Sequence, residues 1–135
     1  MNMIAVYHMA AARTDGKVVA SRMREVRRDE SIVSSTTHFV LLTPDEAMEM
    51  AEVMRSGCGR FSKDDAVSAV EVRCEEHEPF LWLEESEVHQ ITWTLKDGEE
   101  VREEIDCRES GGDGWSWDFA QTLKDAADKA EEEQK

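Results

Sequence analysis

Two Asp-Gly dipeptides constrain the fold of this chain more than any other feature of its sequence. Asp15-Gly16 and Asp97-Gly98 each separate two stretches with β-strand character. Tight hairpins need residues that tolerate positive φ angles, and an Asp-Gly pair between apolar-rich stretches supplies them. The two dipeptides therefore predict two hairpins and a largely antiparallel sheet.

Alternation and β-branched or aromatic residues mark the other strands. Residues 35–42 are apolar on both faces, which is typical of a central strand. Residues 80–83 are short and aromatic, and they follow an acidic break after residue 74. Strands are expected at residues 2–12, 18–28, 35–42, 69–74, 80–83, 88–95 and 100–107, with a loop between the first helix and residue 69.

The second Asp-Gly pair also decides which residues of its hairpin face each other. A two-residue loop would set Trp93 opposite Arg102. A three-residue loop, with its glycine left-handed, sets Trp93 opposite Val101 and also Ile91 opposite Glu103. Only the longer loop keeps most apolar residues on one face, so we expect that register.

The first helix has clear start and stop signals. Thr43 is a good N-cap, Pro44 suits the first helical position, and Glu46 completes a capping box. Gly57 stands at the C-terminal cap position. The apolar stripe of this helix is Ala47, Met50, Ala51 and Met54.

A second helix is expected near the end of the chain. Asp118 with Gln121 three residues later can cap it, after the flexible connector 111–114. Residues 131–135 are expected to form a frayed acidic tail. The order β-β-β-α-β-β-β-β-α then predicts an α+β fold, a mainly antiparallel sheet with two helices on one face, in one domain of residues 1–135.

The acidity of the chain is regional. The formal net charge is −15, and it divides into −1 for residues 1–73 and −14 for residues 74–135. A basic stretch at residues 22–28 adds four arginines to the first half. These arginines either contact a phosphate backbone or an acidic partner, or protect a sheet edge from unwanted pairing. The molecule is therefore expected to be dipolar, and its overall field opposes direct binding of nucleic acid or anionic lipid.

The cysteine content and the absence of a membrane-spanning run or a signal peptide indicate the cellular compartment of the protein. Three cysteines form no disulfide framework, which favours a reducing, cytoplasmic location. No apolar run reaches the roughly 18–20 residues that span a bilayer, and the first residues do not resemble a signal peptide.

Metal binding and catalysis find little support. Cys74 and His77 have ligand spacing, but nothing in the sequence brings Cys58 and Cys107 to them, so no cofactor is expected. The four histidines are scattered and no Gly-x-Ser-x-Gly motif occurs, so the chain is expected not to be an enzyme. A small metal- or thiol-dependent enzyme remains an alternative.

Carboxylates and tryptophans are the candidate contact residues. The expected register projects Glu100, Glu104 and Asp106, interrupted by Arg102, from the sheet face on the other side from Trp93. The supporting acidic residues are Glu75, Glu76, Glu84, Glu85 and Glu87. Trp115 and Trp117 either pack the last helix or anchor a partner, and the seven methionines are expected to be mostly core filler.

These features predict a non-enzymatic inhibitor that docks on a basic, nucleic-acid-binding surface of another protein. Alternate carboxylates on a strand lie roughly 6.5–7 Å apart, similar to successive phosphates, so an acidic sheet face can compete for a nucleic-acid groove. In class and composition the chain resembles phage anti-restriction and anti-CRISPR inhibitors. An immunity protein that neutralises a basic toxin nuclease fits the same physics. The sequence names neither the partner nor the oligomeric state.

Overall fold

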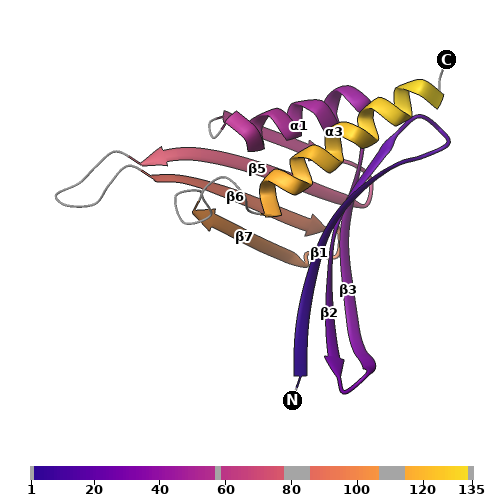
Figure 1. Cartoon of the computed structure of the whole chain (residues 1–135), viewed down its shortest axis with the longest axis vertical. Helices are drawn as coiled ribbons and strands as arrows, with labels where there is room; N and C mark the ends of the chain where they lie inside the picture. Colours follow the sequence, from indigo (N-terminus) through magenta and orange to yellow (C-terminus); the bar gives the residue numbers. More distant parts are fainter. Residues whose placement is uncertain (1, 57–58, 78–85, 107–114, 134–135) are drawn as a thin grey trace.

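The described part of the chain combines two antiparallel sheets with two helices. The computed structural model describes residues 2–56, 59–77, 86–106 and 115–133. Within them seven strands and two helices follow the order β-β-β-α-β-β-β-β-α, which confirms the expected α+β class and order (Figure 1). The strands do not form one continuous sheet, because they divide into a three-stranded and a four-stranded sheet.

The first sheet has the order β1-β2-β3, so the arginine-rich β2 is its central strand and the expectation that residues 22–28 protect an edge is wrong. The third strand also begins at Ser31 rather than residue 35, because a turn with Asp29 at φ 57° closes the hairpin earlier. A β-bulge between Val26 and Arg27 absorbs the extra residue. The strands are β1 (Asn2–Ala12), β2 (Val18–Arg28) and β3 (Ser31–Leu42).

The second sheet contains a strand where a loop was expected. Residues 59–64 pair along their whole length with the next strand, and only Phe61 among them is a buried apolar side chain, which is too little for an alternating pattern. The strand expected at residues 80–83 lies outside the described residues. The order is β4-β5-β6-β7, with β4 (Gly59–Asp64), β5 (Ser68–His77), β6 (Ser86–Leu95) and β7 (Glu100–Asp106).

The predicted register of the β6–β7 hairpin is confirmed. Trp93 pairs with Val101, and Ile91 pairs with Glu103. Gly98 has φ 95°, the positive value that the three-residue loop requires. Trp93 and Ile91 are fully buried, so the parity of this hairpin follows from its apolar residues.

The first helix, α1 (Pro44–Ser56), begins with the predicted capping box. The Thr43 amide donates to Glu46 Oε1 at 2.8 Å, and the Glu46 amide donates to Thr43 Oγ1 at 3.1 Å. Burial raises the pKa of Glu46, whereas its hydrogen bond with the Thr43 backbone lowers it. The net result is a pKa below the ordinary value.

The second helix, α3 (Trp115–Glu133), begins three residues before the expected cap at Asp118. The earlier start brings Trp115 and Phe119 one turn apart against the first sheet, where both rings lie near His8. The helix continues to Glu133, so three of the five residues expected to fray are helical. Among the described residues no helix is both long and apolar enough to cross a bilayer.

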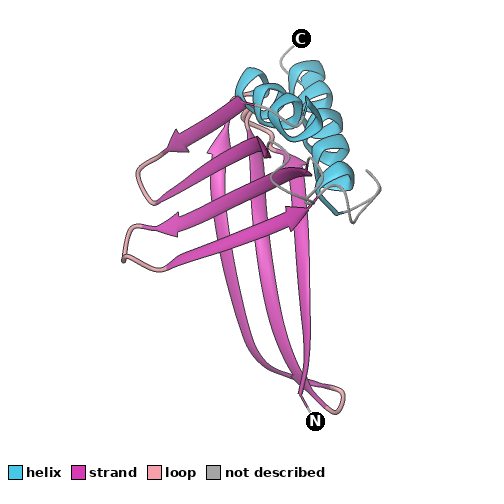
Figure 2. Cartoon of the chain, turned by 90° about the vertical axis from the view of Figure 1, so that its left-hand side faces the viewer, coloured by secondary structure: helices cyan, strands magenta, loops and turns pink. Residues whose placement is uncertain are grey.

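One apolar core joins both sheets and both helices. The two helices lie side by side at one end of the molecule, over the sheets (Figures 1 and 2). Met50 and Met54 are buried there, as expected, but Met3 and Met9 are exposed, so core filler is the wrong role for them. The largest fully buried side chains are Trp93, Phe119, Leu42, Met50, Met54, Ile91 and Leu123.

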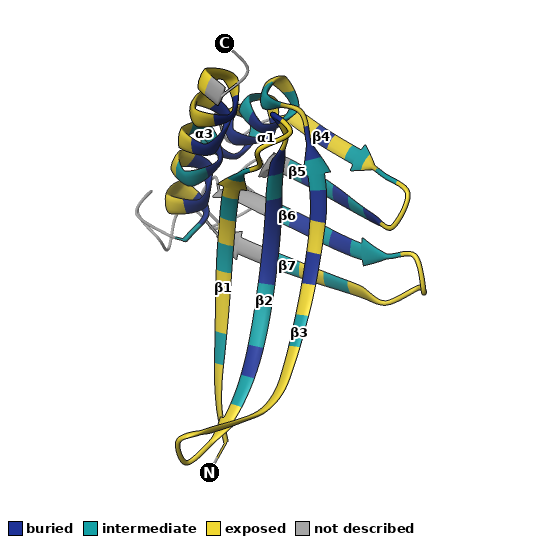
Figure 3. Cartoon of the chain, turned by 90° about the vertical axis from the view of Figure 1, so that its right-hand side faces the viewer, coloured by how far each residue is buried: buried dark blue, intermediate teal, exposed yellow. Residues whose placement is uncertain are grey.

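The first sheet is much longer than the body that it packs on. Its lower half extends away from the helices and past the second sheet, with most positions exposed or half-buried (Figures 2 and 3). We call this half the arm, residues 2–7 and 24–37. The helices and the arm therefore lie at opposite ends of the molecule (Figures 1 and 2).

Candidate functional site

Both helices carry acidic side chains on their solvent side. On α1 the exposed acids are Asp45, Glu49 and Glu52, which recur every three or four residues and therefore share one face. On α3 the last four of the five exposed acids each lie three or four residues from another of them. The five are Asp118, Asp125, Asp128, Glu131 and Glu132. We call these eight residues the acidic helical layer.

This layer holds a large part of the charge excess. The two helices contain ten acidic residues and three basic ones, a balance of −7, whereas the three strands of the first sheet carry four arginines and one glutamate, a balance of +3. The helices and the strands of the first sheet therefore differ in the sign of their net charge. The arm itself is neutral once Asp29 and Glu30 of its turn are counted, and residues 57–114 carry a further −11. The helical spacing of these acids is visible in the sequence, and the helices are a second acidic surface besides the one expected on the sheet.

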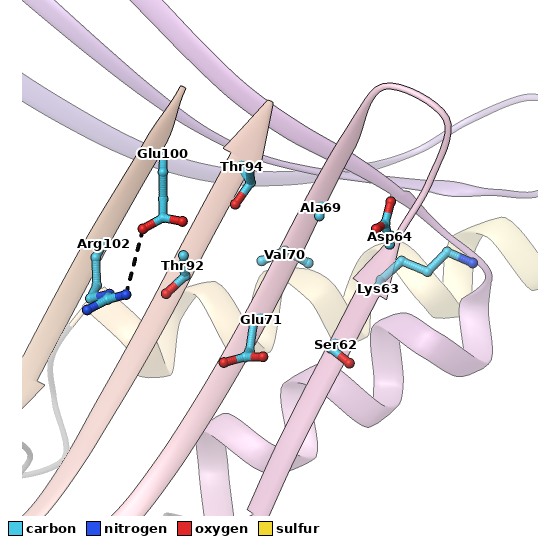
Figure 4. Close-up of a pocket in the computed structure, with 10 residues that line it drawn as sticks. All are labelled: Ser62, Lys63, Asp64, Ala69, Val70, Glu71, Thr92, Thr94, Glu100 and Arg102. Atoms are coloured by element: carbon cyan, nitrogen blue, oxygen red, sulfur yellow. Dashed lines mark ion pairs between the residues drawn. The ribbon is translucent and has the colours of Figure 1, made fainter. Parts of the chain in front are cut away.

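The sheet face expected to be acidic has mixed charge in its described part. A hollow of about 420 Å³ lies on this face of β4–β7, with Thr92 and Thr94 between charged side chains (Figure 4). Glu100 lies 3.6 Å from Arg102, and Glu71 lies 2.5 Å from Arg60. The hydrogen bond from Arg60 is the main reason that the pKa of Glu71 is lowered.

The other predicted sheet residues gather at one end of the second sheet. By backbone register, Val88 pairs with Glu75 on one side and with Asp106 on the other. Glu76 pairs with Glu87, and Glu104 pairs with Gln90. The register therefore brings five predicted acidic positions into three adjacent strands. Glu84 and Glu85 lie outside the described residues.

The two tryptophans have different environments. Trp115 stacks on the His8 ring, with centroids 4.0 Å apart and 13° between the planes, so it packs α3 against β1. Trp117 is 40% exposed, and the Arg55 guanidinium lies 5.8 Å from its ring centroid. Of the pair, Trp117 has the exposure that an interface anchor needs.

A buried carboxylate between the two sheets escaped the sequence analysis. Glu103 accepts hydrogen bonds from His8 Nε2 at 2.9 Å, Arg22 Nε at 2.7 Å and Trp93 Nε1 at 3.2 Å. Burial opposes its ionisation, but the hydrogen bonds and charges of His8 and Arg22 outweigh burial, so the pKa of Glu103 is lowered. The signal was present, because the register placed a charged residue on the apolar face of β7.

Metal ligation finds no geometric support in the part of the chain that the structure describes. No group of three or more His, Cys, Asp or Glu side chains there is placed to hold an ion. Cys58 and Cys107 lie outside the described residues, and Cys74 and His77 are placed only by the backbone of β5.

Comparison with known proteins gives no family. No protein-family model and no curated protein matches the chain. A solved structure of Trypanosoma bruciei MRP1/MRP2 is similar over 98% of this chain and 86% of that chain, at 9% identity and a TM-score of 0.37. Similarity at this level supports no inference about function, which has to come from the site itself.

Proposed function

We propose that this protein is a non-enzymatic binding protein whose acidic helical layer docks on a cationic surface of a partner protein. The observation that carries the proposal is the acidic helical layer, whose exposed acids lie on two adjacent helices of net charge −7 at one end of the molecule, whereas the arm at the other end has no net charge (Figure 1). An acidic layer at one end of the molecule contributes a directed field that orients a cationic partner and speeds its association.

The spacing of these acids suits a surface built for nucleic acid. Residues three or four apart on a helix are separated by about 4.5–6 Å along the axis, comparable to successive phosphates. Glu49 and Glu52 on α1 have this spacing, and so do Asp128 and Glu132 on α3. We therefore infer a partner whose groove normally holds DNA or RNA, as in nucleic-acid-binding defence complexes, with the protein itself in the cytoplasm.

The previously expected contacts have a secondary role in this proposal. Glu100 is paired with Arg102, so it offers a partner less free charge than the helical acids do. Glu104, Asp106 and the acids of β5 and β6 extend the contact only if the partner reaches the second sheet. Trp117 lies on α3 beside the layer and supplies an aromatic contact there.

The test is retention of a partner by the immobilised chain, followed by elution with salt or with a competing DNA duplex. We expect release by both, because exposed charges more than about 8–10 Å apart are screened at physiological salt and the duplex competes for the same groove. Asp128→Lys, on the layer, should abolish retention. Glu30→Lys makes the same +2 change of charge at the tip of the arm and should retain the partner.

Two results would contradict this function. One is a partner that neither salt nor duplex releases. The other is equal loss of retention in Asp128→Lys and Glu30→Lys, which would mean that net charge matters and the layer does not. An immunity protein would behave as the proposal expects, and the retained protein would then be a basic nuclease toxin.

A further inference from the structure

The first sheet presents two apolar faces, although an antiparallel sheet at a surface normally has one. Even-numbered residues of β1–β3 face the body, as shown by His8 against Trp115, Arg22 against Glu103 and His38 near Glu99. Odd-numbered residues share the opposite face, which we call the outer face. In the side view no described helix or strand lies in front of that face (Figure 3).

The outer face is exposed and apolar. Met3 is 69% exposed, Met9 45%, Tyr7 42% and Phe39 36%, and Ile32, which pairs with Arg27 beyond the bulge, is 54% exposed. These five are half of the ten large hydrophobic side chains that are exposed among the described residues. A concentration of this kind marks an interaction surface rather than scattered surface residues.

The two edge strands lack the usual protection against pairing and packing. Sheet edges that face water normally carry charged residues or proline. β1 and β3 together contain no Asp, Glu, Lys, Arg or Pro, in a chain of which 35% is charged. Charges of this sheet are confined to its central strand, so its sequence is that of a sheet covered on both sides.

We propose that a second copy of this chain covers the outer face, so that two first sheets pack face to face about a two-fold axis. Charge favours a copy over a partner chosen for its charge. The only charged residues on the outer face are Glu25 and Arg27, which pair with each other at 3.1 Å. The face is therefore neutral and requires no opposite charge across the interface.

This arrangement also avoids repulsion between two chains of charge −15. The helices pack on the even-numbered face, so a dimer joined through the outer faces keeps both acidic helical layers on its outside. Between the two acidic helical layers lie one helix-to-sheet spacing, one sheet-to-sheet spacing and one sheet-to-helix spacing. Each is about 10 Å, so the layers are roughly 30 Å apart. The Debye length at physiological salt is about 8 Å, so the layers are screened from each other.

The area is adequate for a stable dimer. Eleven-residue strands are about 37 Å long and three strands span about 14 Å, which gives roughly 500 Å² of flat face per copy. Interlocking side chains remove more accessible surface than the flat area. The result approaches the roughly 800 Å² per partner of a standard interface.

The mass of the chain in solution tests the proposal without any other partner, so it can fail independently of the proposed function. Wild type should have twice the monomer mass of 15.4 kDa by light scattering at micromolar concentrations. Tyr7→Lys should halve that mass. Its control is Val6→Lys, which lies next to it on the even-numbered face with equal exposure, 41% against 42%, and should remain dimeric.

Lysine makes the test stringent, because it makes the net charge of each chain less negative and so weakens the general repulsion between two copies. Dissociation of the variant would therefore not be due to general repulsion. Met3→Lys with Ile4→Lys as control repeats the comparison at the end of β1, where exposure is higher and folding is less affected. Circular dichroism confirms that each variant is folded.

The proposal is overturned if the wild-type chain is monomeric throughout. It is also overturned if Tyr7→Lys stays dimeric, or if Val6→Lys dissociates equally, because equal effects would indicate edge pairing along β1 instead of face packing.

Discussion

Replacing Glu103 by glutamine removes the charge that joins the two sheets while it keeps the size of the side chain. Glu103 presents two oxygens to three donors, and its side chain is only 12% exposed. Glutamine has only one oxygen, so not all three donors keep an acceptor. The N–H groups of the glutamine amide would also face these donors, which they cannot satisfy. Arg22, 9% exposed, would then be a buried cation without a counter-charge.

The expected cost follows from that unpaired cation. Removing one partner of a buried ion pair costs about 3–5 kcal/mol. The slight exposure and the remaining glutamine oxygen favour the lower end, so we expect a loss of about 3 kcal/mol. With a urea m-value of about 1.5 kcal/mol/M, the unfolding midpoint should fall by about 2 M.

The assay is urea unfolding at neutral pH, followed by tryptophan fluorescence at one fixed chain concentration. Glu100→Gln is the matched control, because Glu100 lies on the same strand and pairs with Arg102 at 3.6 Å, but is 51% exposed. An exposed pair contributes at most about 1 kcal/mol. Equal shifts of the two midpoints would refute the reasoning. Adding Arg22→Met to Glu103→Gln should restore part of the lost stability, since the buried cation is gone.

Acid should reproduce the effect of the substitution. The pKa of Glu103 in the folded chain lies below its ordinary value of 4.5, so the folded state favours the ionised form. Its contribution is complete above pH 4.5 and is lost as the pH falls through the folded-state pKa. The difference in stability between wild type and Glu103→Gln should therefore shrink below pH 4.5.

Two further substitutions test local features. Asp65→Ala should lower the free energy of unfolding in urea by about 2 kcal/mol. The Asp65 carboxylate accepts backbone hydrogen bonds from Leu41, Val67 and Ser68 and so connects β3 to the β4–β5 turn. Asp65→Asn keeps an oxygen acceptor and should cost less stability. Gly98→Ala should cost about 1–2 kcal/mol from backbone strain alone, since φ is 95° and an added Cβ meets no atom within 4 Å; an unchanged midpoint would exclude that strain.

Features with local causes were predictable from the sequence. The capping box of α1 needs only Thr43 and Glu46, and the β6–β7 register needs only Asp97-Gly98 and the alternation around Trp93. Each of these depends on residues close together in the chain. The start of α3 was misplaced because its first turn is fixed by His8, more than a hundred residues away.

Features that depend on which sheet a strand joins were not predictable. Residues 59–64 contain one buried apolar side chain, so their pairing with β5 is a property of the partner strand. The strands divide into two sheets because β3 leads into α1 and does not pair with β4. The methionines illustrate the same limit, because Met3 and Met50 have the same chemistry and only the layers above them decide which is buried.

The buried ion pair connects the two surfaces that we propose. A charged residue on the apolar face of β7 costs stability unless it is paired, and a hydrophobic residue of similar size would often serve the core as well. The pair also sets how the sheets cross, because Glu103 on β7 accepts hydrogen bonds from β1, β2 and β6 at once and so ties two strands of the first sheet to the second sheet. That crossing sends the arm away from the helices. Fixing it keeps the neutral apolar face and the acidic helical layer apart, so that one surface can meet a copy of the chain while the other meets a cationic partner.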